Sequence, residues 1–264
     1  MYQFGFIGMG NMGSAMLKGC LSVFPASTLA FSRKDTVKGK ALSLETGAVW
    51  IDSNRACAEQ SRYIILAVKP QFYDGVLKEI QPVLDDSRII ISLAPSYTIA
   101  DLKQALGASV RIVRAMPNTP AMVGEGMTGL SWSEDVFSDT ERQELMQFFT
   151  SFGKAETVPE NLMDAVTAAS GSSPAFIYMM IEALADGVVK YGMPRDKAYT
   201  FVAQAVLGSA KMVLETGEHP GVLKDKVCSP GGTTIAAVAS LEASGFRSSL
   251  IEAASAVCER CRNM

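Results

Sequence analysis

Two hydrophobic patterns divide this chain of 264 residues. Over the first 150 residues, short apolar runs alternate with helical patterns, which is typical of a parallel sheet with crossover helices. The runs at 64–68 and 89–91 are apolar at nearly every position, as in strands that helices cover on both faces. The predicted strands span residues 3–8, 28–31, 63–68, 89–92, 110–116 and 127–131. The predicted helices span residues 11–21, 37–46, 75–83, 99–105 and 140–149.

After Pro159 the pattern is helical, with no convincing strand. A break is predicted at 171–174, where a serine cap followed by proline restarts the helix. The predicted helices are residues 161–170, 174–191, 196–216, 235–243 and 247–262. They are apolar on more than one face, so we expect them to be buried in a larger assembly or against another subunit. A helical segment this short has little core of its own, which favours a tight homodimer.

The expected fold is therefore an α/β domain with a parallel-type sheet over residues 1–158, followed by an all-helical domain over residues 159–264. Hydrophobic residues make up 48% of the chain and charged residues 19%, which is enough apolar material for a packed core. The net charge of −3, without a basic patch, argues against nucleic acid and anionic membranes as partners.

No secretory signal and no membrane-spanning run is recognisable, so a cytoplasmic protein is expected. The five cysteines fit reduced thiols in such a compartment. Cys258 and Cys261 form a C-x-x-C on a predicted helix. No second cysteine pair accompanies them, so two ordinary helical thiols are a simpler interpretation than a zinc site. No metal is therefore expected.

A glycine fingerprint follows the first predicted strand and opens a helix. Its glycines are Gly8, Gly10 and Gly13, in the G-x-G-x-x-G order that forms a tight turn against a pyrophosphate and packs a helix on a strand. This context predicts a Rossmann domain that binds a dinucleotide. The expected cofactor contacts in this segment are Ile7, Gly8, Met9, Gly10, Asn11 and Met12.

The end of the second predicted strand indicates which dinucleotide is bound. An NAD enzyme usually has an acidic residue there, whereas this chain has Ser32, Arg33 and Lys34, a hydroxyl and two cations suited to a 2′-phosphate. NADPH is therefore the expected cofactor, with NADH still possible. The alternative is a solvated turn.

Two other strand ends are expected to line the nucleotide crevice, because ligands of parallel sheets bind at the carboxyl ends of the strands. Lys69 is either a phosphate or ribose contact or a surface lysine that caps a turn. The expected contacts here are Ala67, Val68, Lys69, Pro70, Leu93, Ala94 and Pro95, and Asn54 and Asn118 are added to the cofactor set.

A second glycine turn lies near the C-terminus, in the run Ser229-Pro230-Gly231-Gly232-Thr233-Thr234. It precedes a predicted helix, whose unpaired amides would bind an anion other than the nucleotide phosphates. Acid–base groups are scarce: the single histidine, His219, is expected in a loop between helices with a structural role. A reductase without an evident general acid favours a substrate that is already activated, such as a protonated imine.

Residues 227–242 closely resemble the signature of the pyrroline-5-carboxylate reductases. The resemblance extends over essentially the whole chain, through residues 6–12, 67–70, 114–120, 164–168, 170–175 and 219–220. It implies NADPH-dependent reduction of Δ1-pyrroline-5-carboxylate, a cyclic imino acid, to L-proline, the last step of proline biosynthesis. It also implies that the helical domain serves dimerisation and substrate binding. The site would lie between one subunit's nucleotide domain and its partner's helices, in homodimers that often gather into decamers.

The resemblance also implies roles for individual residues. The amides around Gly232, Thr233 and Thr234, with Ser229 and Gly231 in the same turn, would bind the substrate carboxylate. The Thr234 hydroxyl would approach the ring nitrogen and is the expected catalytic group. Asn118 and Thr119 would face the nicotinamide, unless they only shape a turn. Glu160 matches a carboxylate near the substrate. Some members place an acidic residue just ahead of the His219-Pro220 pair, and in this chain it is shifted, with Gly217 preceding Glu218.

Two other interpretations remain open. A β-hydroxyacid dehydrogenase has a similar plan but needs a lysine on the first long helix of its second domain, where this chain offers only Lys190, next to a helix end. A regulator that senses NADP without chemistry would bind the nucleotide but show no turnover.

Overall fold

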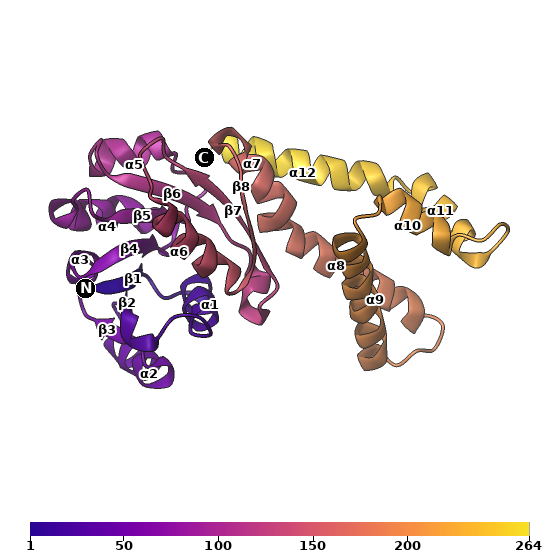
Figure 1. Cartoon of the computed structure of the whole chain (residues 1–264). Coiled ribbons are helices and arrows are strands. Elements are labelled where there is room, and N and C mark those ends of the chain that lie inside the picture. The colour runs from indigo at the N-terminus through magenta and orange to yellow at the C-terminus, as the bar shows by residue number, and fades with distance from the viewer. Residues whose placement is uncertain (264) are drawn as a thin grey trace. The chain divides into compact units, whose positions relative to one another are not determined.

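The computed structural model describes residues 1–263, and the chain folds into two compact units. One unit comprises residues 1–172 together with the chain from Val257 on, and the other comprises residues 173–256 (Figure 1). The boundary at 158/159 expected from the sequence stays a prediction.

The first unit is built on an eight-stranded sheet in the order β3-β2-β1-β4-β5-β6-β7-β8. Neighbouring strands are parallel except for β6 and β7, which pair antiparallel. The predicted α/β class is thus confirmed. The strands are β1 Tyr2–Ile7, β2 Leu29–Ser32, β3 Val49–Ile51, β4 Ser61–Leu66, β5 Ile89–Ser92, β6 Arg111–Met116, β7 Gly126–Trp132 and β8 Gly153–Thr157.

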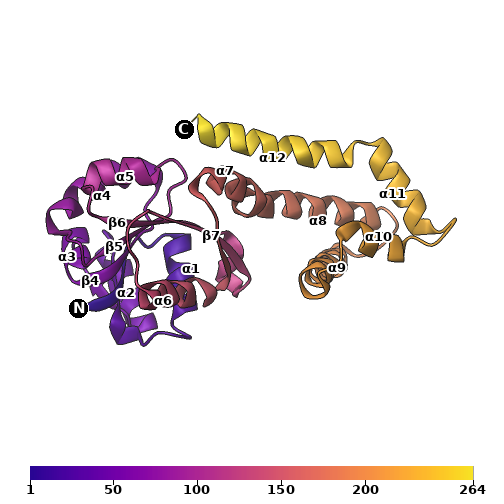
Figure 2. The same ribbon diagram turned by 45° about the horizontal axis from the view of Figure 1, so that its top comes forward.

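Helices cover both faces of this sheet (Figure 2). Successive strand residues alternate between two cores: Ile65 and Ile89 pack on the side of α1 and α6, and Ile64 and Ile90 on the side of α4 and α5. The apolar strands predicted from the sequence are therefore buried on both sides. The helices of this unit are α1 Asn11–Cys20, α2 Thr36–Thr46, α3 Asn54–Glu59, α4 Tyr73–Ile80, α5 Ile99–Leu106, α6 Asp139–Thr150 and α7 Met163–Val166.

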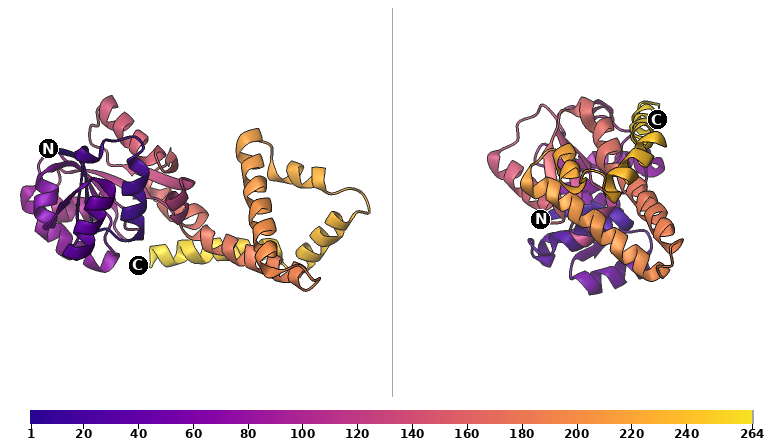
Figure 3. Two further views of the ribbon diagram at one scale, coloured as in Figure 1. Left: turned by 90° about the horizontal axis from the view of Figure 1, so that it is seen from below. Right: turned by 90° about the vertical axis from the view of Figure 1, so that its right-hand side faces the viewer.

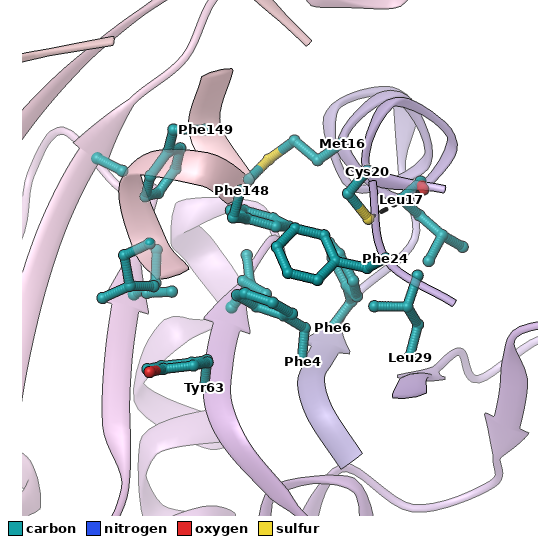
Figure 4. Packing of buried hydrophobic residues seen from close by; sticks show 14 of the residues in the cluster. Phe4, Phe6, Met16, Leu17, Cys20, Phe24, Leu29, Tyr63, Phe148 and Phe149 are labelled. Atoms are coloured by element: carbon teal, nitrogen blue, oxygen red, sulfur yellow. Dashed lines mark hydrogen bonds between the residues drawn. The ribbon is translucent and has the colours of Figure 1, made fainter. Parts of the chain in front are cut away.

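An aromatic cluster joins α6 to the first strand (Figure 4). The ring of Phe4 stacks on Phe148 with centroids 4.4 Å apart, and it meets Phe24 edge-on at 5.0 Å. Phe149 and Phe152 approach Phe148 edge-on from the same end of the helix. This packing fixes β1, and with it the glycine turn that follows the strand.

Three elements of this unit were not predicted. Strand β3 is apolar but has only three residues, too few for a strand pattern, and β8 carries lysine and glutamate with exposed side chains, so it lacks a hydrophobic pattern. Helix α3 is six residues long, too short for a helical repeat to be visible. Pairing with β2 makes β3 regular, and pairing with β7 makes β8 regular.

The second unit is helical (Figure 3). Its helices are α8 Ser173–Val189, α9 Arg195–Thr216, α10 Pro220–Val227, α11 Thr233–Ala243 and the larger part of α12 Phe246–Arg262. Helix α10 was not predicted. Its N-cap is His219, whose Nδ1 accepts a hydrogen bond from the Gly221 amide at 3.1 Å. No helix within residues 1–263 is both long and apolar enough to cross a membrane.

The predicted break at 171–174 is wrong. Residues 167–172 form a π-helical segment, and α8 begins directly at Ser173. Proline lacks an amide proton and clashes with the carbonyl of the preceding helical turn. The wider π turn just before Pro174 accommodates the proline without ending the helix.

The helical unit leaves much apolar surface in water. Within residues 173–256, Ala185 and Ala198 are the buried hydrophobic residues, whereas Phe201 is 65% exposed. Helices α8 and α9 form an apolar groove of about 590 Å³ that is lined by Met180, Leu184, Val188, Met193, Phe201, Val202, Ala205, Val206, Ser209, Ala210 and Val213. A surface of this kind needs a cover, as expected for a subunit of an oligomer.

Candidate functional site

The glycine turn between β1 and α1 has the geometry of a phosphate loop. Gly8 has φ +94°, a conformation that side chains disfavour. A Cβ on Gly13 would lie 2.5 Å from the Gly8 carbonyl oxygen, whereas a Cβ on Gly10 would point into open space. Helix α1 begins after Gly10 without a side-chain cap. Its first amides are therefore available to an anion.

Beside this turn lies a cavity of about 390 Å³ that we call the ribose cavity. It is lined by Gly8, Ser32, Arg33, Lys34, Asn54, Val68, Gln71, Phe72, Gly75, Val76 and Glu79. Six of these, from Gly8 to Val68, were expected cofactor contacts. Two cations and a hydroxyl at the end of β2 therefore face a pocket next to the phosphate loop, which fits a ribose that carries a 2′-phosphate.

A second cavity, of about 540 Å³, lies along the start of α1. Four predicted contacts line it, Met9, Gly10, Asn11 and Arg33. The segment that precedes β7 adds Ala121, Met122 and Gly124. Arg33 lines both cavities. Its side chain is thus shared by the ribose cavity and the cavity at the start of α1.

The ends of β4 and β5 are held by one tyrosine. The buried Tyr73 hydroxyl donates to the Leu66 carbonyl at 2.8 Å and accepts from the amides of Leu93 and Ala94, both at 3.0 Å. Burial raises the pKa of Tyr73 to about 12, so the hydroxyl keeps its proton. The backbone of Leu93 and Ala94 is thus fixed in place, and both amide protons are already donated to Tyr73. Lys69 is exposed and lines neither cavity.

Ile7 and Met12 also lie at the phosphate loop. Ile7 ends β1, is buried, and its carbonyl accepts from the Ala67 amide at 2.8 Å, while the half-buried Met12 packs against the core under α1. Pro70 opens the turn after β4 and is exposed. Pro95 follows β5, and its carbonyl accepts from Arg114 at 2.9 Å.

Asn118 pins the loop that follows β6. Its side chain is buried, its Nδ2 donates to the Ser170 carbonyl at 3.1 Å, and its Oδ1 accepts from the Met127 amide at 2.8 Å. These bonds give the residue a structural role, and they leave one Nδ2 proton for a ligand.

Glu160 is bound inside the first unit. Its Oε1 accepts from Arg114 Nη1 at 2.8 Å and from the Ile99 amide at the start of α5 at 2.7 Å. Arg114 is buried and has an Nε without a hydrogen-bond partner. The carboxylate thus neutralises a buried guanidinium group, a function that its sequence context did not indicate.

The C-terminal glycine turn also opens a helix. Gly231 has φ +68°, and Gly232 is the N-cap of α11 and contributes no side-chain cap. The Gly232 amide donates to the Ser229 carbonyl at 3.0 Å, which closes the turn. Thr233 is exposed and Thr234 half-buried in the first helical turn. The amides that begin α11 are therefore available to a second anion.

Gly217 and Glu218 lie at the junction between α9 and α10. Gly217 ends α9 in a left-handed conformation with φ +65°, which glycine adopts without strain. The next residue, Glu218, pairs with Lys226 of α10 at 2.5 Å. The Glu218 carboxylate is thus engaged in an ion pair with a nearby helix of the same chain.

The C-x-x-C thiols lie in the first unit. Cys258 and Cys261 are free and half-buried, and Cys258 donates to the Asp164 carbonyl at 3.7 Å. Within residues 1–263 no group of three or more His, Cys, Asp or Glu residues is placed to hold a metal ion.

Comparison with known proteins gives two family matches. The family described as "Pyrroline-5-carboxylate reductase dimerisation" matches residues 160–264, and "NADP oxidoreductase coenzyme F420-dependent" matches residues 3–96. Among solved structures, a pyrroline-5-carboxylate reductase from Coxiella burnetii is 32% identical with a TM-score of 0.92, covering 99% of this chain and 98% of that one. The pyrroline carboxylate reductase of Plasmodium falciparum, solved with NADP bound, is 32% identical with a TM-score of 0.88, covering 99% and 97%.

Curated relatives agree along the whole length. The pyrroline-5-carboxylate reductase of Methanosarcina acetivorans is 39% identical, covering 99% of this chain and 97% of its own. The Escherichia coli enzyme of that name is 44% identical, covering 99% of this chain and 98% of its own. With such identity over both units, and with a glycine turn that opens a helix in each, the chain belongs to the pyrroline-5-carboxylate reductase family.

Proposed function

We propose that this chain reduces the C=N bond of Δ1-pyrroline-5-carboxylate with NADPH to give L-proline, the last step of proline biosynthesis, in the cytoplasm. The observation that carries the proposal is the pair of separate anion sites. One lies at the start of α1 beside a cationic cavity, and the other is the uncapped start of α11. A reaction between a phosphorylated cofactor and a small carboxylate needs both.

The first unit fits NADPH. The turn at Gly8 and the amides of α1 would hold the pyrophosphate, and Arg33 and Lys34 would hold the 2′-phosphate. When bound, NADPH supplies the hydride for the C=N carbon. Ser32, Asn54 and Val68 complete the ribose cavity. The strand ends at 67–70 and 93–95, with Asn118, would contact the rest of the cofactor.

The start of α11 would clamp the substrate carboxylate. The amides of Gly232, Thr233 and Thr234 bind its oxygens, and Ser229 and Gly231 shape the turn. The Thr234 hydroxyl approaches the ring nitrogen, and Glu160 offers it the oxygen Oε2. A protonated imine becomes a neutral amine on reduction, so this nitrogen needs no further general acid. Holding the ring in place is then the main contribution of the protein.

The clamp of one chain would serve the nucleotide domain of a second copy. The apolar groove between α8 and α9 offers the surface for a homodimer, and the helical unit belongs to a family described by dimerisation. Homodimers would assemble further into a homodecamer. Dimerisation is then a condition of catalysis.

The test is turnover measured together with binding. Purified protein is mixed with NADPH and pyrroline-5-carboxylate, and the absorbance of the reduced nicotinamide is followed while L-proline is quantified. We expect absorbance loss that needs both reactants and matches proline formation one to one. Binding of NADPH without any loss of absorbance would instead favour an NADP sensor and overturn the proposal.

A further inference from the structure

A chain of hydrogen bonds crosses the ribose cavity and ends on a carboxylate. The Ser32 hydroxyl donates to Asn54 Oδ1 at 2.7 Å, and Asn54 Nδ2 donates to Glu79 Oε2 at 2.8 Å. Glu79 Oε1 also accepts from the Arg55 amide at 3.4 Å. Three elements meet here, because Ser32 ends β2, Asn54 begins α3 and Glu79 lies on α4.

This chain decides which hydrogen-bonding atoms remain for a ligand. The proton of Ser32, which is only 1% exposed, is committed to Asn54, so its oxygen can only accept. Asn54 has its oxygen and one amide proton engaged. The cavity lining therefore offers acceptor oxygens at Ser32 and Glu79, the negative charge of Glu79 and one free amide proton of Asn54. The same lining holds the cations Arg33 and Lys34.

The two sets of groups favour different ligands. Cations bind a 2′-phosphate, whereas hydrogen-bond acceptors bind the free 2′-hydroxyl of a ribose. In NAD enzymes the acidic residue at the end of the second strand is such an acceptor. A phosphate near Glu79 is repelled by the carboxylate, and a hydroxyl is not.

We propose that Glu79 is a selectivity residue that shifts the cofactor site toward nucleotides without a 2′-phosphate. Its charge weakens binding of the 2′-phosphate, and its bond to Asn54 keeps Ser32 as an acceptor for a ribose hydroxyl. The chain then uses NADPH with only a moderate preference over NADH. The inference rests on the cofactor site of the proposed function.

The test measures nucleotide binding directly, without substrate. Isothermal titration calorimetry gives the dissociation constants of adenosine 2′,5′-bisphosphate and of 5′-AMP for the wild type, Glu79→Gln and Glu79→Ala. Glutamine keeps an acceptor for Asn54 but removes the charge. We expect Glu79→Gln to bind the bisphosphate on the order of three- to tenfold more tightly, with 5′-AMP unchanged, and the gain to shrink at high salt.

Glu79→Ala separates charge from positioning. It also releases Asn54, so 5′-AMP should bind more weakly while the bisphosphate again binds more tightly. The matched control is Glu59→Gln, which removes an exposed carboxylate at the end of α3, outside the ribose cavity, and should change neither constant. In turnover, the ratio of kcat/KM for NADPH to that for NADH should rise in both Glu79 variants.

Two results would overturn the inference. Equal, non-zero shifts for both nucleotides would mean that Glu79 only stabilises the fold, and no shift of either constant in both variants would remove it from selectivity. If neither probe bound the wild-type chain, the cofactor site itself would be wrong, and the inference would fall with it. If both probes bind but the ratio of their dissociation constants does not change in the variants, the proposed reductase activity still stands.

Discussion

Thr234 is the residue whose chemistry matters most for the proposed reaction. It lies half-buried in the first turn of α11, next to the exposed Thr233. Both residues contribute amides to the same helix start, but their side chains leave the helix about 100° apart, so only one hydroxyl can face the bound ring. Substituting each threonine in turn therefore distinguishes the role of the Thr234 hydroxyl from that of the backbone amides.

We expect Thr234→Val to lower kcat/KM for pyrroline-5-carboxylate about tenfold, the size of one lost hydrogen bond. Valine keeps the shape of threonine and the amide that binds the carboxylate. The isosteric control Thr233→Val should change kcat/KM by less than about twofold, as for an exposed site. Steady-state kinetics at saturating NADPH would measure both. Equal effects of the two substitutions would remove Thr234 from the mechanism.

Some residues of the ribose cavity could be predicted from the sequence, and others could not. The glycine fingerprint and the cations after β2 could be recognised, because each is a local motif with its own chemistry. Glu79 could not, since it reaches Asn54 across 25 positions and lies on a helix whose polar residues look like ordinary surface. Asn118 was predicted as a cofactor contact, but its bond to Ser170 could not be predicted, because the two residues lie 52 positions apart.

At the scale of elements, the chain uses one device twice: a glycine turn that opens an uncapped helix. The two helix starts lie on different units, so each can be disabled without the other. A Cβ at Gly232 would collide with the Ser229 hydroxyl oxygen, so a side chain there must displace the turn.

Gly232→Val should therefore lower kcat/KM for pyrroline-5-carboxylate by about a hundredfold or more, because small displacements of a binding group have such effects. The dissociation constant of NADPH, measured by fluorescence titration, should stay the same. A circular dichroism spectrum like that of the wild type would show that the helices persist. Joint loss of NADPH binding and activity would show that the second anion site is misplaced.

The elements themselves were predicted as far as their patterns are local. Buried strands such as β4 and β5 are visible as apolar runs, and α1 and α9 as helical repeats. The short β3 and the charged β8 owe their regularity to neighbouring strands. The π turn before Pro174 was missed for another reason: serine followed by proline is an ordinary helix start, and only the wider turn lets the helix run on.

On the scale of the whole molecule, the helical unit has too little buried apolar area for an independent fold. Its two buried hydrophobic residues, Ala185 and Ala198, stand against exposed side chains such as Phe201, Leu214 and Met179. Burying one large apolar side chain contributes about 1.5–3 kcal/mol, so covering this surface with a second copy stabilises the unit strongly. Oligomerisation and catalysis should then be lost together.

Phe201→Glu is expected to separate the subunits, because the charge would be buried without a partner in the groove between α8 and α9. A cost of about 3 kcal/mol raises the dimer dissociation constant more than a hundredfold. Sedimentation velocity should show smaller species, and specific activity should fall on dilution while NADPH binding persists in the first unit. The control Leu44→Glu makes the same kind of exchange on α2, at a residue 90% exposed, and should alter neither assembly nor activity. A fully active monomer of Phe201→Glu would show that one chain completes the site alone, and the proposal that the clamp serves a second copy would then be wrong.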